Sequence, residues 1–117
     1  MKLIIAGTRT LNPSIDDINQ YLQQHNLSSV RFEVVSGKAM GVDTAGEKFA
    51  RYYNLKVHDF PADWERFGRA AGPIRNKLMA EFADALLIIW DGKSAGSRNM
   101  KTIMTNMGKP VYEVIVK

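Results

Sequence analysis

The sequence predicts a three-layer α/β domain, in which a parallel five-stranded sheet carries helices on both faces. Segments with strand character alternate with segments with helix character along the whole chain. Residues 2–6 and 85–90 are continuous apolar runs, which are typical of strands buried on both faces. Strands separated by helices pair in parallel through right-handed crossovers. The length of 117 residues is that of one compact domain, so we expect a single domain over 1–117.

The first half of the chain predicts two strands and two helices. In order these are a strand over 2–6, a helix beginning at Pro13-Ser14, a strand over 31–35 and a helix beginning near Asp43. Gly7 ends the first strand, and Ser14 with Asp17 forms a capping-box pair. Asp43 is expected to be the N-cap of the second helix, since a carboxylate accepts hydrogen bonds from first-turn amides.

The second half predicts three more strands and three helices. In order these are a strand over 55–60, a short helix over 62–71 capped by Asp63, a helix from Pro73 to about Ala83, a strand over 85–90, a helix ending at Gly108-Lys109-Pro110 and a strand over 111–117. The helix after Pro73 is expected to face the core with Ile74, Leu78, Met79 and Phe82. The last helix presents Met100, Met104 and Met107, which form either its core face or the seam of a homodimer.

The composition narrows the classes of function. The chain has no cysteine, so disulfides and thiolate metal sites are excluded, as suits a cytoplasmic protein. No apolar run approaches the roughly 20 residues of a membrane span, and the N-terminus is too short and glycine-rich for a signal peptide. We therefore expect a cytoplasmic protein with no membrane partner. The net charge of +4 permits an anionic ligand or weak nucleic-acid contact without requiring either.

Three loops that follow strands combine glycine, a hydroxyl group and a nearby cation. They read GTRT (7–10), SGKAMGVD (36–43) and DGKSAGS (91–97). Ligands of parallel sheets bind beyond the carboxyl ends of the strands, and glycine-rich turns before helices expose amides that bind phosphate. Arg9, Lys38 and Lys93 would add positive charge within the loops, and Arg98 directly follows the third loop. The loops predict one shared anion-accepting cleft, although glycine in any one of them could serve only the tight turn.

The stretch 61–79 clusters arginines around a tryptophan. Trp64 could stack on a nucleobase, or it could simply cover the edge of the sheet. Arg75 and Asn76 follow Pro73 in the first turn of a helix, where the helix dipole disfavours a cation. Arg75 therefore needs an anionic partner, which would be either a bound anion or a carboxylate such as Asp43.

These segments together resemble the SLOG superfamily, the Rossmann-like group that includes DprA (Smf) and the LOG phosphoribohydrolases. The resemblance rests on GTRT, SGKAMGVDTAGEKFA, FPADWERFGRAAGPIRNKLM, ADALLIIWDGKSAGSRNM and GKPVY, and it is greatest to the YspA-related branch of small bacterial and phage proteins. It implies a Rossmann-like fold that binds nucleotides or nucleotide-derived signals such as NAD and ADP-ribose derivatives. It assigns ligand contacts to Gly7, Thr8, Arg9, Ser36, Gly37, Gly41, Asp43, Arg75, Asn76, Gly92, Gly96 and Ser97.

The chain departs from the superfamily pattern at two places. Lys38 replaces the second glycine of a Ser-Gly-Gly-Ala motif, and Met40 replaces the basic residue that follows it. Met100 stands where the phosphoribohydrolases carry a glutamate, and methionine cannot transfer a proton. The resemblance therefore favours binding over hydrolysis.

Our leading prediction is a nucleotide-binding protein, a sensor or a sequestering protein with no required cofactor, no metal and no catalytic residue. Its ligand-binding residues would be Gly7, Thr8, Arg9, Ser36, Gly37, Lys38, Gly41, Asp43, Trp64, Arg75, Asn76, Asp91, Gly92, Lys93, Gly96 and Ser97. One alternative is an N-glycosidase or phosphoribohydrolase that uses Asp91 as its general base. A second is single-stranded DNA binding through Lys48, Arg51, Lys56 and Lys101, although such charges are usually solvated. The resemblance also favours a homodimer.

Overall fold

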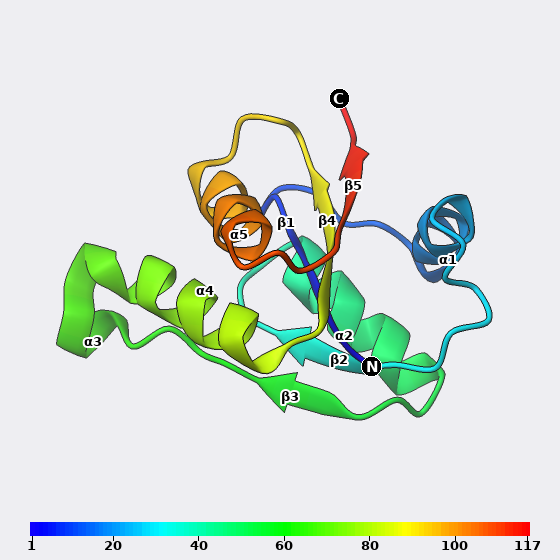
Figure 1. Cartoon of the computed structure of the whole chain (residues 1–117), viewed down its shortest axis with the longest axis horizontal. Coiled ribbons are helices and arrows are strands. Elements are labelled where there is room, and N and C mark those ends of the chain that lie inside the picture. The colour runs from blue at the N-terminus through cyan, green and yellow to red at the C-terminus, as the bar shows by residue number, and fades with distance from the viewer.

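The computed structural model describes all residues 1–117 and has a five-stranded, all-parallel sheet at its centre (Figure 1). The strands are β1 (Lys2–Gly7), β2 (Glu33–Ser36), β3 (Val57–Asp59), β4 (Ala85–Trp90) and β5 (Val111–Ile115). Their order across the sheet is β3-β2-β1-β4-β5, and every adjacent pair is parallel. The predicted α/β class and its parallel five-stranded sheet are confirmed, and the arrangement is Rossmann-like.

Helices cover both faces of this sheet. They are α1 (Ile15–Gln24), α2 (Val42–Tyr52), α3 (Trp64–Phe67), a 3₁₀ turn (Gly68–Ala70), α4 (Ala71–Phe82) and α5 (Ala95–Asn106). One core lies between the sheet and α1 with α2, around Ile18, Val42 and Phe49. The other lies between the sheet and α4 with α5, around Met79 and Met100. No helix has the length and apolar character that a membrane span requires.

Two of the predicted helix starts are confirmed. Ser14 accepts a hydrogen bond from the Asp17 amide, and the Asp17 carboxylate accepts one from the Ser14 amide, both at 3.0 Å. Asp63 caps α3 by accepting from the Arg66 amide at 3.1 Å. Each cap satisfies amides that have no acceptor within the helix.

The prediction that Asp43 caps α2 is wrong. The helix begins one residue earlier, at Val42, and its N-cap is Gly41 with φ of +73°. A side chain on Gly41 would collide with the carbonyl oxygens of Thr8 and Arg9, so glycine is required where the first and second loops touch. Asp43 therefore lies within the first helical turn.

The predicted core face of α4 is also wrong in part. Met79 is buried as expected, but Ile74, Leu78 and Phe82 are exposed. The buried face consists instead of Ala71, Gly72, Asn76, Met79 and Ala80. Small residues let α4 approach α5 closely, and the Asn76 amide donates to Asn99 Oδ1 of α5 at 2.9 Å. Because a hydrogen-bonded asparagine takes a core position here, the spacing of apolar residues predicted the wrong face of α4.

The last helix turns its methionines to the core, which is one of the two alternatives that the sequence left open. Met100 and Met104 are buried, and Met107 is partly exposed at the end of the helix. The chain then turns at Gly108, whose φ is +71°. Lys109 donates through Nζ to the carbonyls of Ala80 and Ala83, which lie at the end of α4. The methionines thus form a core face, which leaves no continuous methionine seam for a dimer.

Candidate functional site

A recess of about 380 Å³ opens at the carboxyl ends of β1 and β4. Strand order reverses at this point, since β2 and β3 extend the sheet on one side and β5 on the other. Nine of the predicted site residues line this recess: Gly7, Thr8, Arg9, Asp43, Arg75, Asn76, Asp91, Gly96 and Ser97. The first and last of the three glycine-containing loops meet here with Asp43 of α2 and two residues of α4.

A second recess of about 330 Å³ adjoins the first and shares Arg9, Ala39 and Arg75 with it. Gly37, Lys38 and Trp64 line this second recess. The Trp64 side chain lies beside Gly72, and Trp64 is 49% exposed. The two recesses together have the size of an ordinary small-molecule site.

Four predicted site residues line neither recess. Ser36 is buried and donates to Glu47 Oε2 at 2.7 Å, while Gly41 holds two loops in contact. Gly92 takes a left-handed φ of +81° in the turn after β4, and Lys93 is exposed beyond that turn. These residues shape the loops, and their side chains are not brought to the recess walls.

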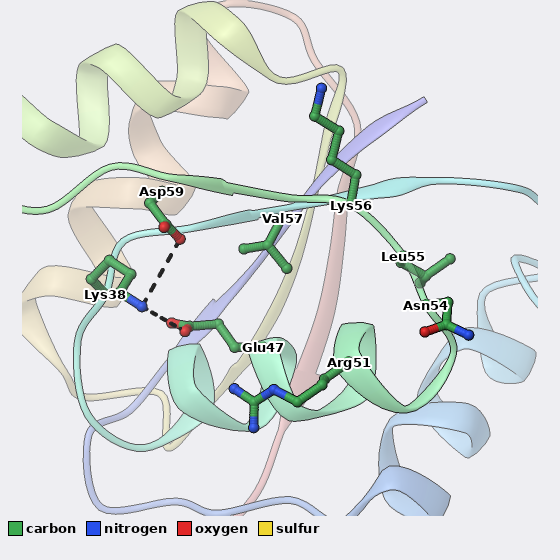
Figure 2. Close-up of a pocket in the computed structure, with 8 residues that line it drawn as sticks. All are labelled: Lys38, Glu47, Arg51, Asn54, Leu55, Lys56, Val57 and Asp59. Carbon is green, nitrogen blue, oxygen red and sulfur yellow. Dashed lines mark hydrogen bonds and ion pairs between the residues drawn. The ribbon is translucent and has the colours of Figure 1, made fainter.

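Lys38 turns its ammonium group away from the recesses. Its Nζ lies 2.7 Å from Glu47 Oε1 and 4.0 Å from Asp59 Oδ1, at the rim of a groove that also contains Arg51 and Lys56 (Figure 2). The hydrogen bond to Glu47 raises the pKa of Lys38 further, so the ammonium stays charged. The backbone of Lys38 has φ of +60°, a conformation that favours glycine.

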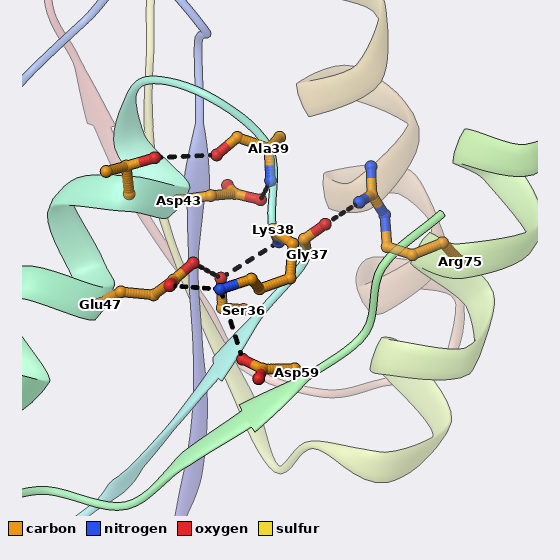
Figure 3. A network of polar contacts seen from close by, with 9 residues as sticks. Ser36, Gly37, Lys38, Ala39, Asp43, Glu47, Asp59 and Arg75 are labelled. Carbon is orange, nitrogen blue, oxygen red and sulfur yellow. Dashed lines mark hydrogen bonds and ion pairs between the residues drawn. The ribbon is translucent and has the colours of Figure 1, made fainter. Parts of the chain in front are cut away.

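Arg75 is held on the opposite side of the second loop. Its Nε donates to Asn76 Oδ1 at 2.9 Å, and its Nη1 donates to the carbonyl of Gly37 (Figure 3). Burial lowers the pKa of Arg75, while the charge of Asp43 opposes that shift. Arginine nevertheless keeps its charge in proteins. With Nε and Nη1 bonded to the protein, Nη2 has no protein partner and the guanidinium is oriented beside the recess.

Asp43 is the buried carboxyl group of the recess. Its Oδ2 accepts a hydrogen bond from the Ala39 amide at 3.3 Å. Burial raises the pKa of Asp43 to about 6, against the lowering effects of the Ala39 amide and of Arg75. Asp43 and Arg75 approach each other across Gly37, where a Cβ would lie 2.7 Å from Arg75 Nη1 and 2.8 Å from Asp43 Oδ2. They form no ion pair within 4.0 Å, so Asp43 does not fully neutralise Arg75.

Asp91, the other carboxyl group of the recess, has a lowered pKa where Asp43 has a raised one. Its Oδ1 accepts from the amides of Lys93 at 2.8 Å and Ser94 at 2.9 Å, which lowers the pKa of Asp91. The carboxylate therefore stays ionised and organises the turn that leads into α5. A carboxylate in this state is a weak proton acceptor near neutral pH. Asp43 is the better acid–base group of the two, a role that sequence reasoning did not assign to it.

Ser97 presents a buried hydroxyl group that no protein atom satisfies. Its Oγ is inaccessible to solvent and has no hydrogen-bond partner, although Ser97 lines the recess. It lies in the first turn of α5, after Ser94, whose Oγ accepts from the Ser97 amide at 3.5 Å. Asn76, by contrast, is fully bonded to Arg75, Asn99 and the carbonyl of Gly96. Asn76 thus positions Arg75, whereas Ser97 keeps its hydroxyl group free.

Sequence reasoning missed Glu47, whose carboxylate binds both Ser36 and Lys38. Its spacing of four residues from Asp43 on α2 could have placed it on the same helical face, near the second loop. The structure has no cluster of three or more histidine, aspartate or glutamate side chains that could hold a metal ion.

The four basic residues predicted for DNA binding do not form one group. Lys101 lies on α5, where it pairs with Glu113 of β5, apart from Lys48, Arg51 and Lys56.

The fold and the site define the class as an α/β protein of Rossmann-like architecture, with a polar recess at the point where strand order reverses. The chain is similar to the Gene 61 protein of Mycobacterium phage D29, with 27% identity over 116 residues that cover 94% of this chain and 93% of that protein. No family model matches the chain, and no solved structure matches it.

Proposed function

We propose that the protein binds a phosphorylated small molecule of the nucleotide type in the recess at the ends of β1 and β4. The observation that carries this proposal is the Ser97 hydroxyl group, which is buried without a partner at the start of α5. A buried polar group without a hydrogen bond costs about 1–3 kcal/mol. Once the Ser97 side chain rotates toward the recess, a phosphate oxygen would accept from this hydroxyl group and from first-turn amides, which together would form an anion site.

The charges around the recess fit a ligand that has both phosphate and sugar hydroxyl groups. Arg9 and Arg75 have no carboxylate within 4.0 Å, and they are the cations available to a phosphate. Asp43 and Asp91 supply carboxylates to the same recess, and such groups accept hydrogen bonds from ribose hydroxyls. A bare phosphate would use only the arginines and the start of α5. A ribose phosphate would use the two arginines for its phosphate and the two carboxylates for its ribose hydroxyl groups.

The adjoining recess supports a nucleobase as the third part of the ligand. Trp64 lies on its wall with its side chain half exposed, and Arg9 and Arg75 border both recesses. An aromatic face beside cations is an ordinary platform for a base. The Rossmann-like fold and the likeness of the loops to the SLOG superfamily support the same ligand class. ADP-ribose, NAD and nucleoside monophosphates are therefore the first compounds to test.

Isothermal titration calorimetry of the purified protein with ADP-ribose, NAD, AMP and cyclic nucleotides tests this proposal. We expect saturable heat with one molecule bound per chain for at least one of them. Ser97→Ala should weaken that binding, whereas Thr105→Ala, which removes an exposed hydroxyl group of the same helix outside the recess, should leave the affinity unchanged. Folded protein that releases no heat with any of these compounds would contradict the proposal.

A second candidate function is hydrolysis of the N-glycosidic bond of a nucleotide, and one observation favours it. Asp43 is buried in the recess and has a pKa of about 6, which suits a group that gives or accepts a proton near neutral pH. It would take the acid–base role that the sequence offered to Asp91. Release of free base from nucleoside monophosphates, abolished in Asp43→Asn but retained in Asp91→Asn, would establish this activity and this assignment.

A further inference from the structure

The segment 61–70, which we call the α3 strap, connects β3 to α4 without packing into the core. It contains α3 and the 3₁₀ turn, and none of its residues is buried. In Figure 1 it projects beyond the sheet, at the end of the molecule toward which β3 points. Its two large apolar side chains, Trp64 and Phe67, are 49% and 39% exposed. A segment with so few buried contacts opens at a low cost in free energy.

The α3 strap is anchored to the rest of the chain at its two ends. Before it, the Phe60 amide donates to the Ser36 carbonyl at 2.8 Å, and after it Ala71 is buried. The one side-chain hydrogen bond of the strap is internal, from the Arg66 amide to Asp63. None of its charged side chains forms an ion pair. Its middle can therefore move without breaking a side-chain hydrogen bond or an ion pair to the rest of the chain.

Gly68 supplies a pivot within the α3 strap. Its φ of +55° and ψ of −132° form a backbone conformation that favours glycine. No atom lies within 4 Å of the position that a Cβ would take there, so packing does not restrain the backbone at this point. Hinges are typically a few residues of this kind at the ends of helices and strands.

The α3 strap forms one wall of the second recess, and the second loop forms another. Pro61, Ala62 and Trp64 line the recess from the strap, and residues 37–40 line it from the loop. Met40 is 72% exposed, so both walls carry an exposed large apolar side chain. A planar ring held between Met40 and Trp64 would cover apolar surface on both of them.

We propose that the α3 strap is a lid that brings Trp64 toward Met40 when a ligand fills the second recess. A docking surface for another protein would carry its apolar groups away from the recess, whereas Trp64 lines it. The nature of the covered ligand rests on the proposed function, while the closing motion follows from the strap itself. The ligand shifts the strap toward the closed form because it binds that form more tightly than the open one.

A disulfide trap tests the motion without any ligand. The chain has no cysteine, so Met40→Cys with Trp64→Cys introduces the only two thiols. A disulfide needs Cβ atoms about 3.5–4.5 Å apart, so its formation reports that the two walls have met. At low protein concentration, diamide should oxidise this pair about tenfold or more faster than the control pair Met40→Cys with Glu65→Cys. Glu65 lies on the same short helix but outside the recess, and circular dichroism would verify that both variants fold.

Tryptic cleavage tests whether the lid closes over the ligand. Arg66 and Arg69 are exposed sites in the α3 strap, and Arg31 is an exposed site before β2 that lines neither recess. AMP or ADP-ribose, at a concentration that saturates in calorimetry, should slow cleavage after Arg66 and Arg69 by about fivefold or more. Cleavage after Arg31 should stay unchanged, because proteolysis follows the open fraction at each site.

The two experiments separate the lid from the proposed function. A selective disulfide in a chain that binds no nucleotide would support the lid and contradict only the nucleotide. Equal oxidation of the two cysteine pairs would overturn the lid, whichever ligand binds. Calorimetric binding without protection of Arg66 and Arg69 would also overturn it, as would protection of the strap by a macromolecule alone.

Discussion

The recess at the ends of β1 and β4 and the groove beside Lys38 are both rimmed by charged side chains, but they differ in how those charges are paired. In the groove Lys38 binds Glu47, which in turn binds Ser36, with Asp59 nearby (Figure 3). In the recess Arg9 and Arg75 have no ion pair, and the Ser97 hydroxyl group has no partner. The groove is the larger of the two, at about 540 Å³ against about 380 Å³. The buried hydroxyl group without a partner, more than volume, is therefore what makes the recess the ligand site that we propose.

The largest effect on stability is expected from breaking the contact between the first and second loops at Gly41. Gly41→Ala would place a methyl group against the carbonyls of Thr8 and Arg9 at a φ of +73°. We expect a loss of about 3 kcal/mol in the free energy of unfolding, measured by urea denaturation. Gly92→Ala is the matched control, because Gly92 has a φ of +81° but no atom near its missing side chain. Its loss should be only about 1 kcal/mol, and equal losses would contradict this account of the loop contact.

Removing the oriented cation should weaken the proposed ligand binding next most strongly. Arg75→Ala should weaken the binding of AMP or ADP-ribose by about 1.5–3 kcal/mol, as expected on losing a charged hydrogen bond. Lys77→Ala, two residues along the same helix but outside the recess, should leave the affinity unchanged. Calorimetric titration measures both, and an unchanged affinity in Arg75→Ala would remove Arg75 from the site.

Burial of Asp43 predicts a pH-dependent stability. Its folded pKa of about 6 lies above the ordinary value, so the folded state holds this proton more tightly than the unfolded chain does. The contribution of Asp43 to stability is therefore greatest below about pH 4 and is lost as the pH rises to about 6. Asp43→Asn should raise the free energy of unfolding by about 1–2 kcal/mol at pH 7.5 and by little at pH 4. Urea denaturation at both pH values would contradict this if the gain were larger at pH 4.

The smallest effect is expected at Lys38 in the groove, because its charge already has a partner in Glu47. Lys38→Ala removes an exposed ion pair, and such pairs contribute little to stability. The affinity for a ligand of the recess should stay within about twofold of that of the parent chain. A large loss of affinity, measured by the same titration, would show that the ammonium of Lys38 leaves Glu47 and enters the site.

Much of the fold could be predicted from local patterns. The apolar run 85–90 became the fully buried strand β4, and the Ser14–Asp17 capping box began α1. The core face of α4 could not be predicted from apolar spacing, because Asn76 enters the interior through hydrogen bonds to α5. Likewise the start of α2 depends on a contact between Gly41 and the first loop, which no pattern within the helix reveals.

The candidate site could be predicted to the level of its loops but not of each side chain. Parallel topology brings Arg9, Asp43, Asp91 and Ser97 to one edge of the sheet, as their positions after strands predicted. The direction of Lys38 depends on Glu47, nine residues further along the chain, and on Asp59 in β3. The raised pKa of Asp43 depends on burial that only the packed loops create. Long-range contacts of this kind lie beyond what sequence spacing can show.

The most direct test of the central claim is a titration of the ¹⁵N-labelled protein with ADP-ribose or AMP, followed by amide chemical shifts. Amides of Thr8, Arg9, Gly96 and Ser97, which border the recess, should shift progressively and saturate. Amides of Glu47, Arg51 and Lys56, which border the groove, should stay unchanged. Saturating shifts in the groove with none in the recess would contradict the claim that the unpaired polar groups of the recess bind the ligand.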